Sequence, residues 1–285
     1  MSAFHVLPRN PYFEVLGGLN FENAGDNKVC MISEVDLSSI ERLRARGGIK
    51  PTYTAWLAKA IALGLRKHPH ANRFPLVLPF WRRIVQLHDV HVSVAVERDR
   101  PGMEQAVFVG TLRDTDNKAL SEITSDLRAL ARATPENCPR WRTFNRLVET
   151  LPGFLARWIV SIPRWSASMW VEHRGGAAMI SSPAKYGVDT MIGNWPWPLG
   201  FSFGLVKERP MVVNGQVVAR PTMALTMSFD RRLMGGAPAA RFFKCIVDIL
   251  EHADVEMAAF LPPAETEPQG TVMSASQLPA VETVS

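Results

Sequence analysis

The sequence predicts an α/β fold, and three observations favour this class. Large and small side chains alternate over residues 223–229, and valines occupy every second position over residues 90–96. A period of two is typical of strands with one buried face. Apolar residues recur at helical spacing over residues 53–68. Because strand and helix patterns follow one another along the chain, we expect a sheet and helices packed as layers.

The predicted elements follow in order along one domain over residues 28–260. Residues 1–27, which contain Pro8 and Pro11, are expected to form an N-terminal arm. Strands are predicted over residues 28–35, 90–96, 106–112, 177–182, 201–206, 211–218 and 223–229. Helices are predicted from Ser38 to Gly47, from Tyr53 to His68 with Thr52 as N-cap, from Asp116 or Asn117 onward, and from Pro238 to His252. Residues 261–285 lack an apolar pattern, which predicts a disordered tail.

Composition and charge exclude several classes of protein. The net charge is modest, 32 − 27 = +5, so the chain as a whole does not resemble a nucleic-acid-binding protein. Cys30, Cys138 and Cys245 are odd in number and show no metal-ligand spacing, which predicts reduced thiols, no metal site and a cytoplasmic location. No secretory signal is apparent, and no apolar run reaches the roughly 18 residues that a spanning helix needs.

The stretch Met227–Phe242, MSFDRRLMGGAPAARF, is predicted to hold a strand end, a tight turn and a helix start. Gly235 and Gly236 are expected to supply backbone angles that other residues avoid. Pro238 suits the first turn of a helix, where its missing N–H costs nothing.

This stretch resembles the signature of the catalytic domain of dihydrolipoyl acyltransferases, and more distantly that of chloramphenicol acetyltransferases. The family pattern is Ser-Phe/Tyr-Asp-His-Arg-x-x-Asp/Asn-Gly-Ala-x-x-Ala-Arg-Phe. The matching positions are Ser228-Phe229-Asp230, Arg232, Gly236-Ala237 and Ala240-Arg241-Phe242. The two positions that carry the family's chemistry differ: Arg231 stands at the histidine, and Gly235 stands at the Asp/Asn.

Further segments extend the resemblance over about residues 28–255. "EVDLSSIERLRAR", "TAWLAKAIALGLRKHPHAN", "VGTLRDTDNKALSEI" and "ISSPAKYGVD" look like successive family segments in the family's order. The resemblance implies a chloramphenicol acetyltransferase-like two-layer sandwich that assembles as a trimer, with active sites in channels between subunits. The chain begins almost at this domain, so we do not expect a complete acyltransferase component.

The absent histidine would remove the proton acceptor of the family's reaction. In the family, a neutral histidine deprotonates the thiol of coenzyme A or dihydrolipoamide, and a positioned base is typically worth ~10²–10⁴ in rate. Arginine keeps its proton at neutral pH, so Arg231 cannot replace that base. Two roles for Arg231 stay open: pairing with Asp230 or Asp189, or binding an anion, thiolate or oxyanion.

Other candidate residues follow from the same resemblance. Ser181 stands where the family places a serine that bonds the oxyanion, although a serine there could also simply bond to backbone. Trp195 and Trp197 replace part of an Asn-Pro-Pro-Gln segment and are expected to narrow the substrate channel. His91 lies on the small-residue face of its strand, either as a channel residue or as a packed one.

A long segment over residues 139–176 is expected to be a helical insertion in the domain. Residues 140–174 hold six arginines, two glutamates and four of the eight tryptophans. Arginines beside an aromatic face are typical of interfacial membrane helices. The alternative is a hairpin packed on its own domain or on a neighbouring subunit. The candidate membrane or partner contacts are Trp141, Arg157, Trp158, Trp165 and Trp170.

Two functions remain after this reading of the sequence. One is a non-catalytic assembly protein, a homo-oligomer of three or more subunits that keeps only the acyltransferase fold. The other is a coenzyme A-dependent acyltransferase that works by an altered mechanism, with coenzyme A or acyl-CoA as its ligand. The insertion would add contacts to a protein partner or a membrane surface, and no nucleic acid is expected.

Overall fold

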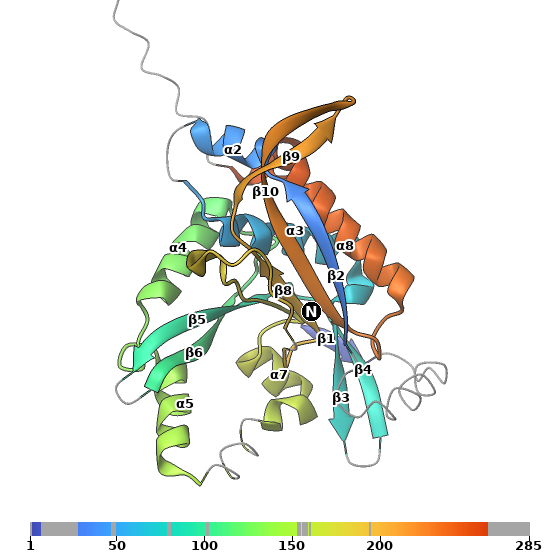
Figure 1. Ribbon diagram of the computed structural model, residues 1–285. Helices are drawn as coiled ribbons and strands as arrows, with labels where there is room; N and C mark the ends of the chain where they lie inside the picture. The colour runs from blue at the N-terminus through green and yellow to red at the C-terminus, as the bar shows by residue number, and fades with distance from the viewer. Residues whose placement is uncertain are drawn as a thin grey trace, which may run out of the picture.

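A computed structural model describes residues 2–6, 28–46, 50–78, 81–100, 103–152, 155, 159, 161–193 and 195–261 (Figure 1). Most of the predicted N-terminal arm and nearly all of the predicted tail therefore lie outside the described residues. The predicted α/β class is confirmed, because a large mixed sheet carries helices on one of its faces.

The large sheet has seven strands in the order β2-β10-β8-β7-β5-β6, with β9 paired to β10. The strands are β2 (Lys28–Asp36), β5 (Val92–Arg100), β6 (Met103–Leu112), β7 (Ala178–Ile180), β8 (Leu199–Phe203), β9 (Lys207–Val213) and β10 (Gln216–Asp230). The β5–β7 and β7–β8 pairs are parallel and the others are antiparallel. Residues 216–230 form one continuous strand, where the sequence predicted two, and β9 and β10 meet at a turn formed by Asn214 and Gly215.

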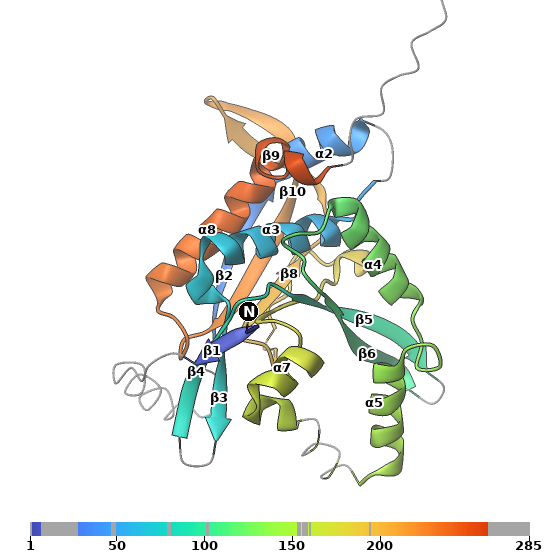
Figure 2. The same ribbon diagram turned by 180° about the vertical axis from the view of Figure 1, so that it is seen from behind.

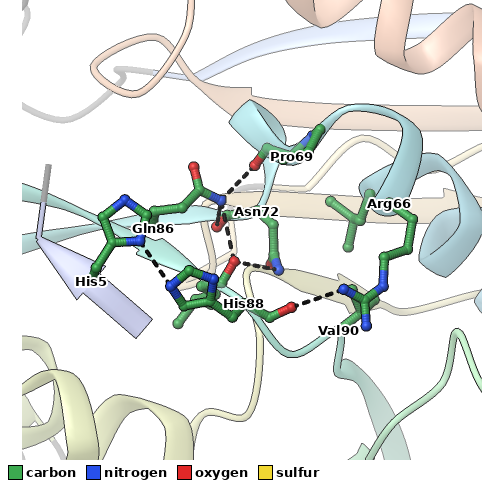
Figure 3. Close-up of a pocket in the computed structure, with 9 residues that line it drawn as sticks. His5, Arg66, Pro69, Asn72, Gln86, His88 and Val90 are labelled. Atoms are coloured by element: carbon green, nitrogen blue, oxygen red, sulfur yellow. Dashed lines mark hydrogen bonds between the residues drawn. The ribbon is translucent and has the colours of Figure 1, made fainter. Parts of the chain in front are cut away.

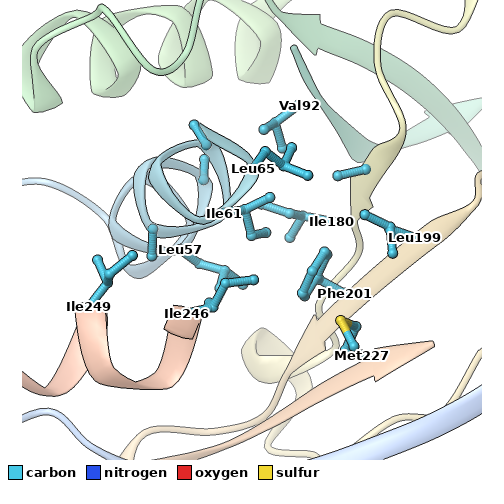
Figure 4. Close-up of a cluster of buried hydrophobic side chains, with 14 of the residues drawn as sticks. Leu57, Ile61, Leu65, Val92, Ile180, Leu199, Phe201, Met227, Ile246 and Ile249 are labelled. Atoms are coloured by element: carbon cyan, nitrogen blue, oxygen red, sulfur yellow. The ribbon is translucent and has the colours of Figure 1, made fainter. Parts of the chain in front are cut away.

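Helices cover one face of this sheet (Figure 2). The helical elements are α2 (Ser38–Ala45), α3 (Tyr53–Lys67), α4 (Leu120–Arg132), α8 (Gly236–Glu251), α9 (Ala253–Glu256) and the short turns η1 (Pro69–Ala71), η3 (Ala184–Tyr186) and η4 (Ala258–Phe260). Thr52 caps α3 as predicted, since its hydroxyl accepts a bond from the Ala55 N–H at 3.2 Å. The core lies between α3, α8 and the sheet, where Ile61 and Ile246 meet Phe201 (Figure 4).

The opposite face of the sheet carries small and polar side chains. Because side chains alternate along a strand, the large residues of β10 point into the core and the small ones point outward. Ser228 lies between Cys30 of β2 and Gly200 of β8, and Thr226 lies between Ile32 and Ser202. No helix among the described residues covers β2 and β10 on this side (Figure 1).

A second sheet was not predicted from the sequence. Its three strands are β1 (Phe4–Val6), β4 (Trp81–Leu87) and β3 (Arg73–Leu78), in the order β1-β4-β3. The alternation of β4 is hidden by Trp81-Arg82-Arg83 at its start, and β3 contains Pro75, which disfavours a strand. This sheet stands beside the end of α3 and forms one wall of a pocket described below.

The insertion contains α5 (Pro139–Thr150), η2 (Ile162–Trp165) and α7 (Ala167–His173). Two of its predicted contact residues point inward, which corrects the expectation for them. Trp141 is 4% exposed, packs on Phe108 and donates to the Val109 carbonyl at 3.2 Å. Trp170 is equally buried and stacks on Phe74 with ring centroids 4.6 Å apart. These indoles anchor the insertion to its own domain.

Candidate functional site

The turn after β10 is organised by one buried ion pair. Asp230 is 3% exposed, and its two carboxylate oxygens accept bonds from the Arg232 guanidinium at 2.6 to 3.1 Å. One of these oxygens also accepts the Arg232 backbone N–H at 2.9 Å. The carboxylate raises the pKa of Arg232, since it stabilises the charged guanidinium. This pairing fixes the direction in which the chain leaves the sheet.

Arg231 does not pair with Asp230 or Asp189, the structural role that its sequence left open. Asp230 is held by Arg232, and Asp189 is held by Lys207 at 2.6 Å and by Arg209 at 3.3 Å. The Arg231 side chain is exposed and forms no ion pair or hydrogen bond with any residue that the structure describes. Its guanidinium is therefore available to solvent or to another molecule.

Gly235 precedes α8 as its N-cap, with φ −73° and ψ 170°. This is ordinary extended backbone, and the chain's described glycines with positive φ are Gly175, Gly187 and Gly215. The expectation that Gly235 and Gly236 supply special backbone angles is thus wrong. A Cβ on Gly235 would approach only Pro238, at 3.8 Å, and one on Gly236 would approach nothing. The fold would therefore accept a side chain at either position.

Trp195 and Trp197 lie beside the same end of β10. The Lys28 ammonium donates to the backbone carbonyls of both, and the Pro198 carbonyl accepts the Asp230 N–H at 3.0 Å. The Trp195 ring lies so close to Gly200 that a Cβ there would fall 1.8 Å from it. Gly200 is therefore needed for Trp195 to lie flat on the sheet.

Trp197 is anchored to the end of the insertion. Its indole N–H donates to the Arg174 carbonyl at 2.9 Å, and the Arg174 guanidinium lies 5.0 Å from the ring centroid. Lys28 and Arg174 were not singled out from the sequence. Lys28 lies opposite Asp230 in the register of β2 and β10, which only the folded structure reveals.

Ser181 lies farther along the open face, directly after β7. Its backbone N–H donates to the Phe201 carbonyl at 2.9 Å, and its hydroxyl has no partner among the described residues. Beside it on β8, the buried Ser202 hydroxyl also lacks a partner in the described structure. Thr226 on β10 is satisfied by the Met191 carbonyl at 2.9 Å. This part of the sheet therefore offers free hydroxyl donors.

One copy of the chain does not bring Ser181 and Arg231 together. The register places Ser181 beside Ser202, which pairs with Thr226, five positions before Arg231. Two strand spacings and five residues of strand separate the two positions by about 20 Å. A site that used both would need residues from more than one copy.

His91 is packed against a turn. It is 7% exposed, and its Nδ1 accepts the Asp114 backbone N–H at 3.1 Å. Burial lowers its pKa, and the nearby Arg113 adds to this effect. His91 directly precedes β5, which lies three strands from β10, about 14 Å away. The structure thus gives His91 the packed role that the sequence left open.

The remaining predicted contact residues belong to the insertion. Trp165 is half-buried at the end of η2, with the Arg164 guanidinium 5.3 Å from its ring centroid. Arg157 and Trp158 lie outside the described residues. Within the described ranges, no group of three or more His, Cys, Asp or Glu side chains could hold a metal ion, and no helix is long and apolar enough to cross a membrane.

A comparison with models of protein families identifies the family to which this chain is related. The model for the catalytic domain of the 2-oxoacid dehydrogenase acyltransferases matches residues 27–139 and 170–258. The chain belongs to this family. The unmatched residues between the two segments fall within the predicted insertion, and the matched ones include both β10 and the turn that follows it.

Curated members of the acyltransferase family are distant relatives of this chain. The acetyltransferase component of the Bacillus subtilis pyruvate dehydrogenase complex is 24% identical over 220 residues, which are 74% of this chain and 42% of that protein. The succinyltransferase component of the Bartonella vinsonii 2-oxoglutarate dehydrogenase complex is 27% identical over 229 residues, which are 77% of this chain and 46% of that protein. The chain thus spans less than half the length of these relatives.

Solved structures show the same fold. The Azotobacter vinelandii dihydrolipoamide acetyltransferase is similar with a TM-score of 0.58 and 22% identity, over 88% of this chain and 94% of that one. A serine, a histidine and an asparagine have been investigated there for their catalytic role, and the last two are four positions apart, as Arg231 and Gly235 are here. Chloramphenicol acetyltransferase matches with a TM-score of 0.52 and 13% identity, over 86% of this chain and all of that one. The predicted chloramphenicol acetyltransferase-like sandwich is confirmed.

Proposed function

We propose that this family member is a non-catalytic, homo-oligomeric assembly protein that keeps the acyltransferase fold without its proton acceptor. The observation that carries the proposal is Arg231, at the family's histidine position in the signature, exposed and unpaired within the described structure. A guanidinium has no lone pair that could accept a thiol proton. Gly235 offers no side chain to support such a step.

Four of the chain's seven histidines are held by contacts of their own. His91 is held by Asp114, and His5 and His88 bond to each other. His68 packs with its ring centroid 6.0 Å from Phe242 on the helical side of the sheet. These contacts occupy the four imidazoles, which supports a silent centre.

Exposed apolar side chains on and beside the open face support an oligomer. Ile32 is 54% exposed in the middle of β2, and Val188 and Ile192 are exposed in the loop that reaches Thr226. Apolar side chains gathered on one surface commonly mark a protein interface. A trimer closed through this face would cover them and would place Ser181 of one copy nearer to Arg231 of another. The three free cysteines agree with a cytoplasmic location.

The test is release of free coenzyme A from acyl-CoA donors with dihydrolipoamide as acceptor, followed by chromatography because this transfer leaves the total number of free thiols unchanged. The wild type is compared with the double variant Arg231→His/Gly235→Asp, and Arg128→His, which changes an exposed arginine of α4, is the matched control. We expect no release above background in the wild type and in Arg128→His. Release in the double variant alone would identify a lost enzyme and support the proposal.

Turnover by the wild type would overturn the proposal. It would favour the second candidate, a coenzyme A-dependent acyltransferase with an altered mechanism, for which the free Ser181 hydroxyl is the supporting observation. Ser181→Ala would then lower the rate, because one hydrogen bond to the oxyanion would be lost. Binding of coenzyme A to the wild type, followed separately, would show whether ligand recognition remains without chemistry.

A further inference from the structure

A pocket of about 390 Å³ lies away from the turn after β10, between the end of α3 and the small sheet (Figure 3). Leu65 and Arg66 of α3 form one side, and His5 of β1 and His88 after β4 form the other. Small-molecule sites commonly have volumes of about 300–1,000 Å³. The pocket is large enough for a compound with a short apolar chain.

The polar wall of the pocket is held rigidly. The Gln86 amide donates to the carbonyls of Pro69 at 2.6 Å and Asn72 at 3.0 Å, while Arg73 donates to its oxygen at 2.9 Å. The Asn72 amide donates to the carbonyls of Leu87 and Asp89, at 3.3 and 3.0 Å. A wall fixed in this way needs little ordering when a ligand binds.

Two imidazoles face each other at the mouth of this pocket. His5 Nδ1 and His88 Nε2 are 2.8 Å apart, so one of them carries the proton that joins the rings (Figure 3). In the neutral state, the outer nitrogens then comprise one donor and one acceptor. If the pair gains one proton, both outer nitrogens become donors and the pair carries a positive charge. Such a pair is suited to an anion.

Arg66 supplies a fixed positive charge beside the pair. Its Nε is paired with Asp116, and its Nη1 donates to the His88 carbonyl at 3.3 Å. These bonds hold the guanidinium at the pocket while part of the fork remains open, since the side chain is about half exposed. Arginine's planar fork is well matched to a carboxylate.

The rest of the lining is apolar, from Leu65, Leu87, Val90 and the ring of Pro69. We propose that this pocket binds a small aliphatic carboxylate, with its charged end at His5, His88 and Arg66 and its chain against these apolar residues. The site does not depend on the proposed loss of catalysis at Arg231. It assigns a role to β1, because His5 reaches the pocket only through the pairing of β1 with β4.

Saturation-transfer NMR with hexanoate tests the site, with hexanol and inorganic phosphate as probes that lack the charge or the chain. We expect hexanoate to bind with Kd in the region of about 1 mM, and the other two at least about tenfold more weakly. His88→Gln and His5→Gln keep a polar side chain but cannot carry a positive charge. Each should weaken hexanoate binding about tenfold at pH 6. His252→Gln, at an exposed histidine after α8, is the matched control and should leave binding unchanged.

Three results would overturn the proposal. They are no hexanoate binding to the folded wild type, equal binding by the wild type and both pocket variants, or phosphate binding as tightly as hexanoate. Circular dichroism of each variant establishes that it is folded before binding is measured. A hexanoate signal that is equal in the wild type and the His252→Gln control and weaker in both pocket variants would support the site.

Discussion

Arg232, and not its neighbour Arg231, holds the buried carboxylate of Asp230, with contacts to both oxygens at 2.6 to 3.1 Å. The two arginines are adjacent in sequence but differ completely in their surroundings. One completes a buried ion pair, and the other projects from the turn without a partner among the described residues. The pair therefore offers a matched comparison of two substitutions one position apart.

Arg232→Ala should destabilise the protein by about 3–5 kcal/mol, because it leaves the buried Asp230 carboxylate without its counter-charge. Arg231→Ala should change the free energy of unfolding by less than about 0.5 kcal/mol, as an exposed substitution does. Urea unfolding followed by tryptophan fluorescence measures both. If both variants lost the same free energy of unfolding, the assignment of the ion pair to Arg232 would be contradicted.

Gly235→Asp should stabilise the protein by about 0.5–1 kcal/mol. The substitution places a good capping side chain at the start of α8 and reduces the freedom of the unfolded chain. The backbone there is ordinary, and the nearest atom to an added Cβ is 3.8 Å away. The midpoint of thermal unfolding should rise. Gly187→Asp serves as the contrasting control, because Gly187 has a φ of 76° and should lose stability.

Lys59 should make stability rise with pH in the alkaline range. The side chain is fully buried, and its ammonium donates to the carbonyls of Asp116 and Lys118 at 2.6 and 2.8 Å. Burial lowers its pKa from 10.5 to about 8, because the charged form is taken out of water. Between these values the unfolded chain binds more protons than the native one, so the free energy of unfolding increases with pH.

The measurement is the difference in unfolding free energy between the wild type and Lys59→Met from pH 7 to 10.5. This difference should change in favour of the wild type by about 3 kcal/mol across that window. Lys244→Met, at an exposed lysine of α8, is the control and should show no such trend. A constant difference for Lys59→Met would show that the buried ammonium has an ordinary pKa.

Ile32→Glu should disrupt the proposed assembly. The residue is 54% exposed in the middle of β2 on the open face, and a carboxylate there would lose its water in an interface. Native mass spectrometry should show trimers or larger species for the wild type and monomers for the variant. Val255→Glu, at a more exposed site on α9, should keep the wild-type mass. A monomeric wild type would remove the basis of this prediction.

Periodicity was informative where one face of an element is buried. The alternation at Met223–Phe229 predicted the core-facing side of β10 because that strand is central and covered by helices on one side. The small sheet was not predicted, because Pro75 in β3 and the Trp81-Arg82-Arg83 run in β4 interrupt the alternation of apolar and polar side chains. Its strands are held by pairing with each other, which a single segment of sequence does not reveal.

The candidate site was only partly predictable for related reasons. A signature motif placed Arg231 and Gly235 at the turn, but nothing in the sequence tells which of two adjacent arginines meets Asp230. An amphipathic stripe likewise does not say what its apolar side contacts. Packing on the same domain and contact with a partner or a membrane were therefore both open for Trp141 and Trp170, and the structure buries both rings. The Lys28 bonds to Trp195 and Trp197 join distant parts of the chain and required the folded structure.

The distance of about 20 Å between Ser181 and Arg231 within one copy also determines how mixed assemblies would behave. Consider a mixed trimer of this chain and two relatives that carry the histidine. Arg231 would inactivate the site at one subunit interface, while Ser181 would still contribute to the site at another. The activity of such a trimer would then fall stepwise with the number of copies of this chain, and one copy would not inactivate the sites formed by the other subunits.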